Sequence, residues 1–301
     1  MKEAVLRVRR TVLGYEHRAS RYPVLWLVLG SVLGLLGAAC SNAGSGGTDA
    51  GVGKGGQETG GSAADTSPLG ECPTTLPGPK LVRVPAPDAT AYCIDSTEVT
   101  GAQYAEFLAA GPDPTANSQG VTCSGNTTLT NGISLPADMS AVGYVDWCDS
   151  AAYCHWAGKR LCGKIGGGSG TLASINDATQ SEWYNACSAG GTRVYPYGDT
   201  KDPEACAGDD IADPRSEGGY PGIFCMSAGL TEWTDECEPV AANPPYVACA
   251  RRGGVRAVGS PCSQDTDPDA GPTWQLAQSN RNDNLAQIGF RCCYGPGDAS
   301  S

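Results

Sequence analysis

Apolar residues recur at helical spacing in three stretches of the chain. The first is "VTGAQYAEFLAAG", where Tyr104 and Phe107 lie about one turn apart. Thr100 stands in a suitable place for an N-cap and Gly111 ends the pattern, so the spacing predicts a helix. Just before it, residues 91–95 form an apolar run that predicts a short strand.

Two further stretches predict helices, and the rest of the chain predicts loops. Residues 146–157 place Trp147 and Ala151 on neighbouring turns, and "TQSEWYNACSAGG" predicts a short helix that ends at Gly190. Residues 112–141 are rich in Pro, Gly, Asn and Thr and predict a loop. Beyond the third helix only turns and short apolar runs are expected, which indicates an irregular, loop-rich α+β fold.

The longest apolar run lies near the N-terminus. Val24–Ala39 is uncharged over 16 residues and ends in small residues, and residues 1–22 before it carry six basic and two acidic side chains. A basic region, a short apolar core and small residues at its end are typical of an export signal. A spanning helix needs about 20 apolar residues, so we expect residues 1–39 to be a signal peptide.

The residue after this segment is a cysteine, which resembles the lipobox of bacterial lipoproteins. In that motif the cysteine, here Cys40, is lipidated and becomes the first residue of the mature protein. Gly37 stands where the motif usually has leucine, and Leu36 lies one place earlier. Ordinary signal cleavage and an uncleaved anchor are the alternatives.

A flexible tether is expected between this cysteine and the folded domain, over residues 40–71. Ser41–Pro68 has no aromatic residue and is dominated by glycine and small polar residues, a composition typical of a flexible coil. Loss of the basic N-terminal segment takes the net charge from −12 to −16, because that segment carries six basic and two acidic residues. Such a charge disfavours nucleic acid and an anionic membrane surface as partners.

The cysteines indicate the compartment of the protein. Fourteen follow Cys40, all between Cys72 and Cys293, and none form a CxxC pair. An even number in an exported chain predicts up to seven disulfides and an oxidising compartment. Beyond Cys40 the only histidine is His155, so zinc clusters and Ser-His or Cys-His catalysis are disfavoured. Its aromatic neighbours favour a packing role over a ligand role.

Seven segments in order resemble the formylglycine-generating enzyme (sulfatase-modifying factor) family. The resemblance covers about two thirds of the chain, from Tyr92 to Tyr294. The segments are "IDSTEVTGAQYAEFL", "VDWCDSAAYCHWAGKRL", "SEWYNACSAGG", "YPYGD", "LTEWTDE", "RRGG" and "GFRCC".

The resemblance implies a variant of the C-type-lectin fold with small antiparallel sheets, long loops and several disulfides. We place the domain at residues 72–295, followed by a tail over 296–301. The resemblance also implies a disulfide between Cys187, in the third predicted helix, and Cys292, which follows "GFR".

The enzymes of this family use two cysteines that bind copper, and only one has a counterpart here. In them a double glycine is followed by Ser and then by two cysteines five residues apart, which oxidise a substrate cysteine in a Cys-x-Pro-x-Arg sequence. Here Val255 follows the double glycine, the first cysteine position falls at about Val258, and the second lies near Cys262. Two soft thiolates are needed to hold Cu(I), so Cys262 would be catalytic, with copper, only if the oxidase interpretation holds. We expect Cys249 and Cys262 to be disulfide ends.

Besides copper, calcium is the other cofactor to consider from the sequence. Gly229 stands where family members have an asparagine that binds calcium. An acidic cluster nearby could supply oxygen ligands, with a solvated acidic loop as the alternative. Its members are Asp209, Asp210 and Asp213.

Three functions follow as hypotheses. The first is a surface-anchored, non-catalytic binding or structural module, because a disulfide-bonded core that presents loops suits recognition. The second is a copper-dependent formylglycine-generating oxidase, and the third is a calcium-dependent lectin-like carbohydrate binder. The expected partners are an unknown protein or glycan and, through the lipid anchor, the bilayer of a bacterial cell envelope, facing the periplasm or the cell surface.

Overall fold

The computed structural model describes most of the chain beyond residue 68. The described residues are 69–116, 119, 123–129, 140–208, 210–241, 246–254, 259–263, 278–280 and 286–295. The chain divides into two units, 1–58 and 59–301, and all described residues belong to the second. The expected signal peptide, Cys40, most of the tether and the tail at 296–301 therefore lie outside the described residues.

The three predicted helices are confirmed, each with the N-cap that its sequence supplies. They are α1 (Gly101–Ala109), α2 (Trp147–Trp156) and α3 (Glu182–Ser188). Thr100 caps α1 in a reciprocal capping box with Gln103, a pattern that satisfies two of the amide groups left open at a helix start. Ala189 ends α3 in the left-handed conformation. No helix in this part of the chain combines the length and apolarity needed to cross a membrane.

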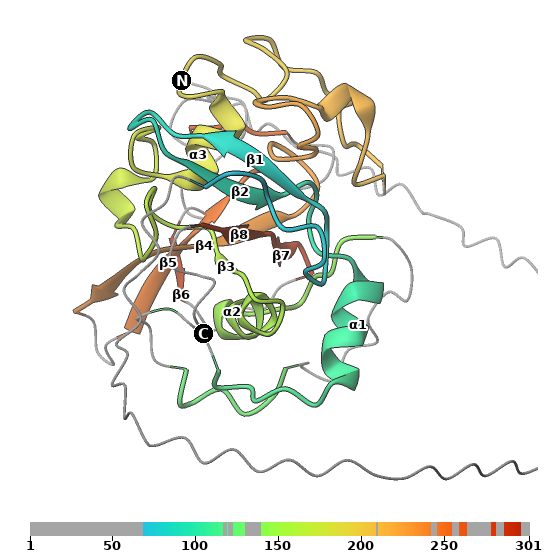
Figure 1. Ribbon diagram of the computed structural model, residues 1–301, viewed down its shortest axis with the longest axis vertical. Helices are drawn as coiled ribbons and strands as arrows, with labels where there is room; N and C mark the ends of the chain where they lie inside the picture. Colours follow the sequence, from blue (N-terminus) through green and yellow to red (C-terminus); the bar gives the residue numbers. More distant parts are fainter. Residues whose placement is uncertain are drawn as a thin grey trace, which may run out of the picture. The chain divides into compact units, whose positions relative to one another are not determined.

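Among the described residues, the strands form two four-stranded sheets (Figure 1). The first has the order β1-β2-β8-β3, all antiparallel: β1 Leu81–Pro85, β2 Ala91–Asp95, β8 Cys292–Tyr294 and β3 Arg160–Leu161. The second has the order β6-β5-β4-β7: β6 Gln278–Asn280, β5 Tyr246–Arg252, β4 Thr231–Val240 and β7 Ile288–Phe290. Two short 3-10 helices, η1 (Leu172–Ser174) and η2 (Pro214–Ser216), lie in the loops.

The C-terminal segment joins the two sheets. β7 pairs with β4 in the second sheet, and β8 pairs with β2 and β3 in the first. Only Arg291 separates β7 from β8, so this residue lies where one sheet passes to the other. Its side chain is fully buried and becomes important for the charged groups described below.

The expectation that only turns and short apolar runs follow α3 is wrong, because β4 has ten residues and β5 has seven. The sequence of β4, "TEWTDECEPV", contains four acidic residues and shows no clean alternation. Glu232, Asp235 and Glu236 are nevertheless buried there. Their charges are compatible with a buried strand because distant side chains and backbone groups contact them.

All fourteen cysteines after Cys40 form disulfides, which confirms the prediction of seven. The bonds are Cys72–Cys93, Cys123–Cys148, Cys154–Cys292, Cys162–Cys293, Cys187–Cys262, Cys206–Cys225 and Cys237–Cys249. With the family match below, the two sheets, few helices, long loops and seven disulfides confirm the expected fold class.

The pairing expected between Cys187 and Cys292 is wrong. Cys187 bonds to Cys262, and Cys292 bonds to Cys154 on α2. Neighbouring residues of a strand point to opposite faces of its sheet, and Cys292 and Cys293 are neighbours on β8. Cys292 therefore meets α2 on one face and Cys293 meets Cys162 on the other, while Cys187 belongs to a different cluster of core residues from Cys292.

The apolar core has two main parts. One is built on α1, α2 and β7, where the rings of Tyr104, Phe107, Tyr153 and Phe290 have centroids 5.2 to 6.3 Å apart. The other surrounds α3 and includes Trp183. The single histidine of this part of the chain, His155, lies half-buried on α2.

Candidate functional site

Buried ion pairs surround the C-terminal segment in the described part of the core, and three of them are considered in turn. Lys159 contacts Asp95 at 2.6 Å, Arg160 donates to both oxygens of Glu182 at 2.6 Å, and Arg291 donates to both oxygens of Glu232 at 2.7 Å. These side chains are at most 5% exposed. Removing one partner of such a pair leaves an uncompensated buried charge, so these residues hold the fold together.

Arg291 has the most contacts of this group. Besides Glu232, it donates to the carbonyl oxygen of Asp95 at 3.1 Å and to that of Phe224 at 3.0 Å. Trp183 completes the site by donating its Nε1–H to Glu232 at 2.8 Å. The "GFR" segment of the sequence is thus part of the architecture at the junction of the two sheets.

The residue nearest to the expected copper site is Cys262, and its sulfur is bonded. The disulfide partner, Cys187, lies on α3, and both residues are fully buried. The backbone of Cys262 is also fixed, because its N–H donates to Val194 at 2.7 Å and its carbonyl accepts from Arg252 at 2.9 Å. Val255 and Val258 lie outside the described residues.

The double glycine before this segment has a structural reason. Gly253 has φ of +80°, and a Cβ atom there would lie 2.7 Å from the carbonyl oxygen of Met226. Gly254 and Ser260 both donate their N–H groups to the carbonyl of Ser227, at 3.0 and 2.7 Å. Glycine at 253 therefore permits the close approach of the backbone at Met226.

Cys249 is bonded across the sheet to Cys237. The two residues are directly opposite each other in the antiparallel pair β4–β5. Both cysteines near the double glycine, Cys249 and Cys262, are therefore disulfide ends, as expected from the sequence.

The acidic cluster does not present open ligands where the structure describes it. Asp213 caps η2 and accepts from Arg215 at 2.9 Å and from the N–H of Cys206 at 3.0 Å. The hydrogen bonds from Arg215 hold the pKa of Asp213 below its usual value. Asp210 is exposed and accepts from the N–H of Ala212, and Asp209 lies outside the described residues. Calcium in this loop stays a prediction, and the pairing of Asp213 disfavours it.

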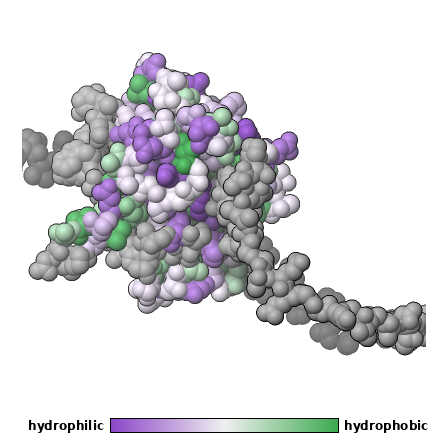
Figure 2. Space-filling model, turned by 60° about the vertical axis from the view of Figure 1, so that its left-hand side comes forward, coloured by the Kyte–Doolittle hydropathy of each residue, from purple (hydrophilic) through white to green (hydrophobic). Residues whose placement is uncertain are grey.

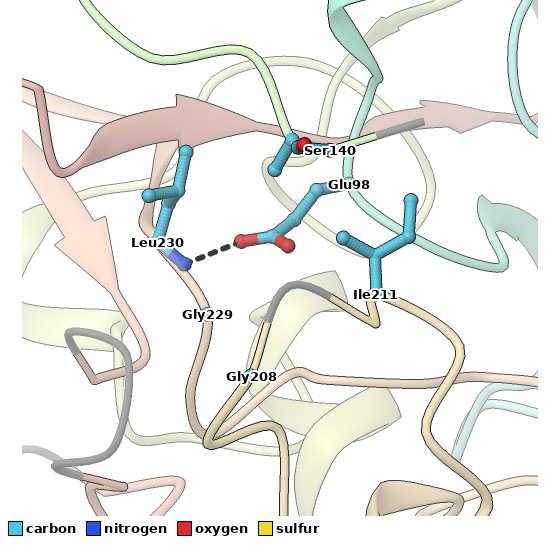
Figure 3. Close-up of a pocket in the computed structure, with 7 residues that line it drawn as sticks. Glu98, Ser140, Gly208, Ile211, Gly229 and Leu230 are labelled. Carbon is cyan, nitrogen blue, oxygen red and sulfur yellow. Dashed lines mark hydrogen bonds between the residues drawn. The ribbon is translucent and has the colours of Figure 1, made fainter. Parts of the chain in front are cut away.

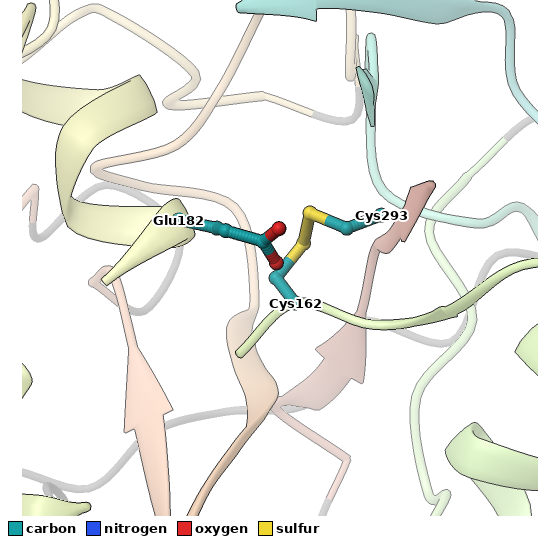
Figure 4. Close-up of side chains that lie close together, drawn as sticks. All are labelled: Cys162, Glu182 and Cys293. Carbon is teal, nitrogen blue, oxygen red and sulfur yellow. A yellow bond between two sulfur atoms is a disulfide. The ribbon is translucent and has the colours of Figure 1, made fainter. Parts of the chain in front are cut away.

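One group of side chains in the described chain has the composition of a metal site (Figure 4). Cys162, Glu182 and Cys293 bring potential ligand atoms within 4.8 Å of one another. The two sulfurs form a disulfide, and the Glu182 oxygens accept from Arg160 and from the N–H of Gly163. Neither thiolate nor an open carboxylate is present, so the group is structural.

A small pocket presents a carboxylate of a different kind (Figure 3). Glu98, in the turn between β2 and α1, is fully buried. Its Oε1 accepts from the N–H of Leu230 at 2.6 Å, while its Oε2 has no hydrogen-bond partner among the described residues. The other lining residues are Ser140, Ala141, Gly208, Ile211, Gly229 and Leu230.

The surroundings of Glu98 disfavour its charged form. Burial raises the pKa of its carboxyl to about 8, and the nearby Glu232 carboxylate adds to this. Arg291 and the N–H of Leu230 act in the opposite direction. Sequence reasoning gave Glu98 no role. The available signal was a glutamate placed two residues before the helix cap Thr100 and next to the apolar Val99.

The described surface exposes large hydrophobic side chains only singly. On the face shown in Figure 2, hydrophobic residues occur in small separate groups among hydrophilic and neutral ones. The large hydrophobic side chains exposed in the described chain are Tyr144, Val194 and Tyr246. They belong to separate segments, so the Glu98 pocket is the site that we pursue.

Comparisons with known proteins were made on the sequence and on the structure. The family model of the sulfatase-modifying factor enzyme 1-like domain matches residues 55–294, which is most of the chain. The structure is similar to that of CarF, with 18% identity, 69% of this chain and 87% of that chain covered, and a TM-score of 0.42. It is also similar to PvdO from Pseudomonas aeruginosa, with 16% identity, 75% and 99% coverage, and a TM-score of 0.44. No curated protein matches the chain.

Proposed function

The chain belongs to the sulfatase-modifying factor enzyme 1-like domain family, and we propose that it is a binding or structural module and not a formylglycine-generating oxidase. The disulfide between Cys187 and Cys262 carries this proposal. It occupies the one sulfur that stands near the expected copper site.

The chemistry of copper explains why this disulfide matters. Cu(I) needs soft thiolate ligands, and a sulfur in a disulfide is neither charged nor free to coordinate. Cys262 is also fully buried, as is its partner. A substrate thiol could reach this sulfur only after the local structure opened and a reductant cleaved the bond.

The place of action that we propose is the outside of a bacterial cytoplasmic membrane. Seven disulfides in one domain are typical of an oxidising compartment such as the periplasm or the cell surface. A lipid on Cys40 would attach the protein to the bilayer, and the glycine-rich segment would hold the folded domain away from it. The ligand would then be a protein or a glycan in that compartment.

Cysteine mapping tests the proposal directly. The full chain, exported by a bacterial host and purified without reductant, is alkylated and then digested and analysed by mass spectrometry. We expect a peptide pair linked through Cys187 and Cys262 and no label on Cys262. The same preparation, supplied with copper and a Cys-x-Pro-x-Arg peptide, should form no aldehyde.

The contrary results are equally specific. Label on Cys262, or copper-dependent aldehyde formation that Cys262→Ser abolishes and Cys249→Ser does not, would replace our proposal by the oxidase hypothesis. Each of these two variants breaks one disulfide, so the comparison separates catalysis from a general loss of stability. Glycan binding that a chelator abolishes would instead support the calcium-dependent lectin.

A further inference from the structure

The buried acids around the Glu98 pocket differ in their charge balance. Two of the buried acids in this region have basic partners, since Asp95 pairs with Lys159 and Glu232 pairs with Arg291. Glu98 is the third acid, and the guanidinium of Arg291 already donates to the carboxylate of Glu232 and to the backbone carbonyl of Asp95. An isolated charge is costly to bury, so Glu98 needs either a proton or a cation from outside.

The geometry leaves one oxygen for that cation. Oε1 is held by Leu230, and the Oε2 atom has no hydrogen-bond partner among the described residues. Figure 3 shows the carboxylate between the side chains of Leu230, Ser140 and Ile211. Gly229 packs against it so closely that a Cβ there would lie 2.9 Å from either oxygen. The position of the carboxylate therefore depends on glycine at 229.

The lining of the pocket selects among cations. A divalent calcium ion takes six to eight oxygen ligands, and Glu98 is the only acidic residue among the described residues that line the pocket. A guanidinium group favours two parallel hydrogen bonds to both oxygens of a carboxylate, whereas only Oε2 of Glu98 is open here. A quaternary ammonium favours aromatic faces, and the lining residues include no aromatic one.

A primary ammonium group meets these conditions. It is compact, carries three N–H donors and can bind a single oxygen. The hollow has room for about three water-sized groups, which fits the ammonium and the first carbons of its chain. Ile211 and Leu230 supply apolar side chains beside that chain.

We propose that the Glu98 pocket binds a primary ammonium group on a short aliphatic chain, as in a lysine side chain or a free alkylamine. This inference rests on the proposed binding function and names the chemistry of its ligand. In the bound state an ammonium N–H donates to Oε2 of Glu98, and the proton that Glu98 held in the empty pocket is released to solvent.

Proton release makes the binding depend on pH. The charged groups that act on Glu98 are Glu232 on β4 and Arg291 between β7 and β8. With burial they place the pKa of Glu98 at about 8, so most of the empty pocket is neutral at pH 7. Only the ionised fraction binds an ammonium, and we expect the dissociation constant to fall about tenfold from pH 7 to pH 9.

The test measures the binding of n-butylamine to the full chain by calorimetry at pH 7 and pH 9. Glu98→Gln is the main variant, because its amide oxygen can still accept from Leu230 while its NH₂ group takes the place of Oε2. We expect the variant to bind at least tenfold more weakly than the natural protein at pH 9. Asp149→Asn is the matched control, since it neutralises another buried acid that has a raised pKa but lies outside the pocket.

A second variant keeps Glu98 and closes the entrance. Ile211 is half-buried, and Ile211→Trp should weaken amine binding without altering the carboxylate. Equal affinity in the Glu98→Gln variant and the natural protein, or affinity independent of pH in the natural protein, would overturn the inference.

Two probes distinguish the sources of the ammonium. A peptide with one central lysine is compared with the same peptide acetylated on that lysine. Binding of the free lysine peptide alone points to a protein partner, whereas binding of n-butylamine without either peptide points to a small amine. Failure of every amine would end this inference but leave the proposed function standing, because that function is tested by cysteine mapping and aldehyde formation.

Discussion

Glu98 and Glu232 are two buried glutamates of the same region, and they differ in how their oxygens are satisfied. Glu232 accepts two hydrogen bonds from Arg291 and one from Trp183. Glu98 accepts one hydrogen bond, from a backbone N–H, and one of its oxygens has no hydrogen-bond partner within the described chain.

The difference shows what burial alone does to a carboxyl group. Both side chains are almost completely removed from water. Glu232 has an opposite charge at hydrogen-bond distance and serves the architecture, while Glu98 is left with a raised pKa and an open hydrogen-bonding position. Glu98, which accepts fewer hydrogen bonds than Glu232, is thus the residue with an oxygen open to a ligand.

The largest effect is expected from breaking the satisfied pair. Arg291→Met would leave Glu232 as a buried charge without its partner and would also remove donors from the carbonyls of Asp95 and Phe224. We expect the free energy of unfolding to fall by about 3 to 5 kcal/mol, measured by denaturant titration.

A surface pair provides the control for this experiment. Arg215→Met removes the partner of Asp213, but the Arg215 side chain is 53% exposed. Because water screens an exposed pair, its loss should lower the free energy of unfolding far less than Arg291→Met does. A similar loss in both variants would contradict the architectural role of Arg291.

Neutralising Glu98 should raise the free energy of unfolding instead of lowering it. Its folded pKa of about 8 lies above the unfolded value, so its protonation stabilises the fold fully below pH 4.5. That stabilisation is lost as the pH rises through about 8. Glu98→Gln lacks this decline and should be more stable than the natural protein at pH 9, by an amount on the order of a few kcal/mol.

The measurement is a set of thermal or denaturant unfolding curves at intervals between pH 4.5 and pH 9. Asp149 and Asp235 also have raised pKa values, about 7 and about 6, and contribute their own losses of stability. The difference between the natural protein and the Glu98→Gln variant removes their contributions. A difference that stays constant over this range would show that Glu98 is ionised throughout.

Local sequence was sufficient for the helices. The cap at Thr100, the spacing of Tyr104 and Phe107 and the short strand at 91–95 all depend on neighbours within one or two turns. β4 could not be predicted in the same way. Its buried acids obtain partners from far along the chain, as when Glu232 pairs with Arg291, 59 residues away.

The same distinction between local and distant contacts applies to the candidate site. The compartment and the cysteine count predicted that Cys249 and Cys262 are disulfide ends, but not which cysteines they join. Pairing depends on which face of a strand each sulfur occupies, as Cys292 and Cys293 illustrate on β8. The open oxygen of Glu98 is a still less local property, because it depends on all the described residues that surround the pocket and donate no hydrogen bond to it.

The smallest expected effect comes from removing one donor from Glu232. Trp183→Phe deletes the Nε1–H that donates to the carboxylate, and Trp233→Phe is the matched control, whose Nε1–H donates to the neutral carbonyl of Val145. Both rings are buried and both lie beneath an arginine, so the losses of volume and of cation–π contact are similar. Hydrogen bonds to charged groups stabilise more than neutral ones, and we expect Trp183→Phe to cost about 1 kcal/mol more in denaturant unfolding. An equal cost would mean that the hydrogen bonds from Arg291 alone satisfy the carboxylate of Glu232. The two glutamates would then differ only in that Glu98 lacks an arginine partner.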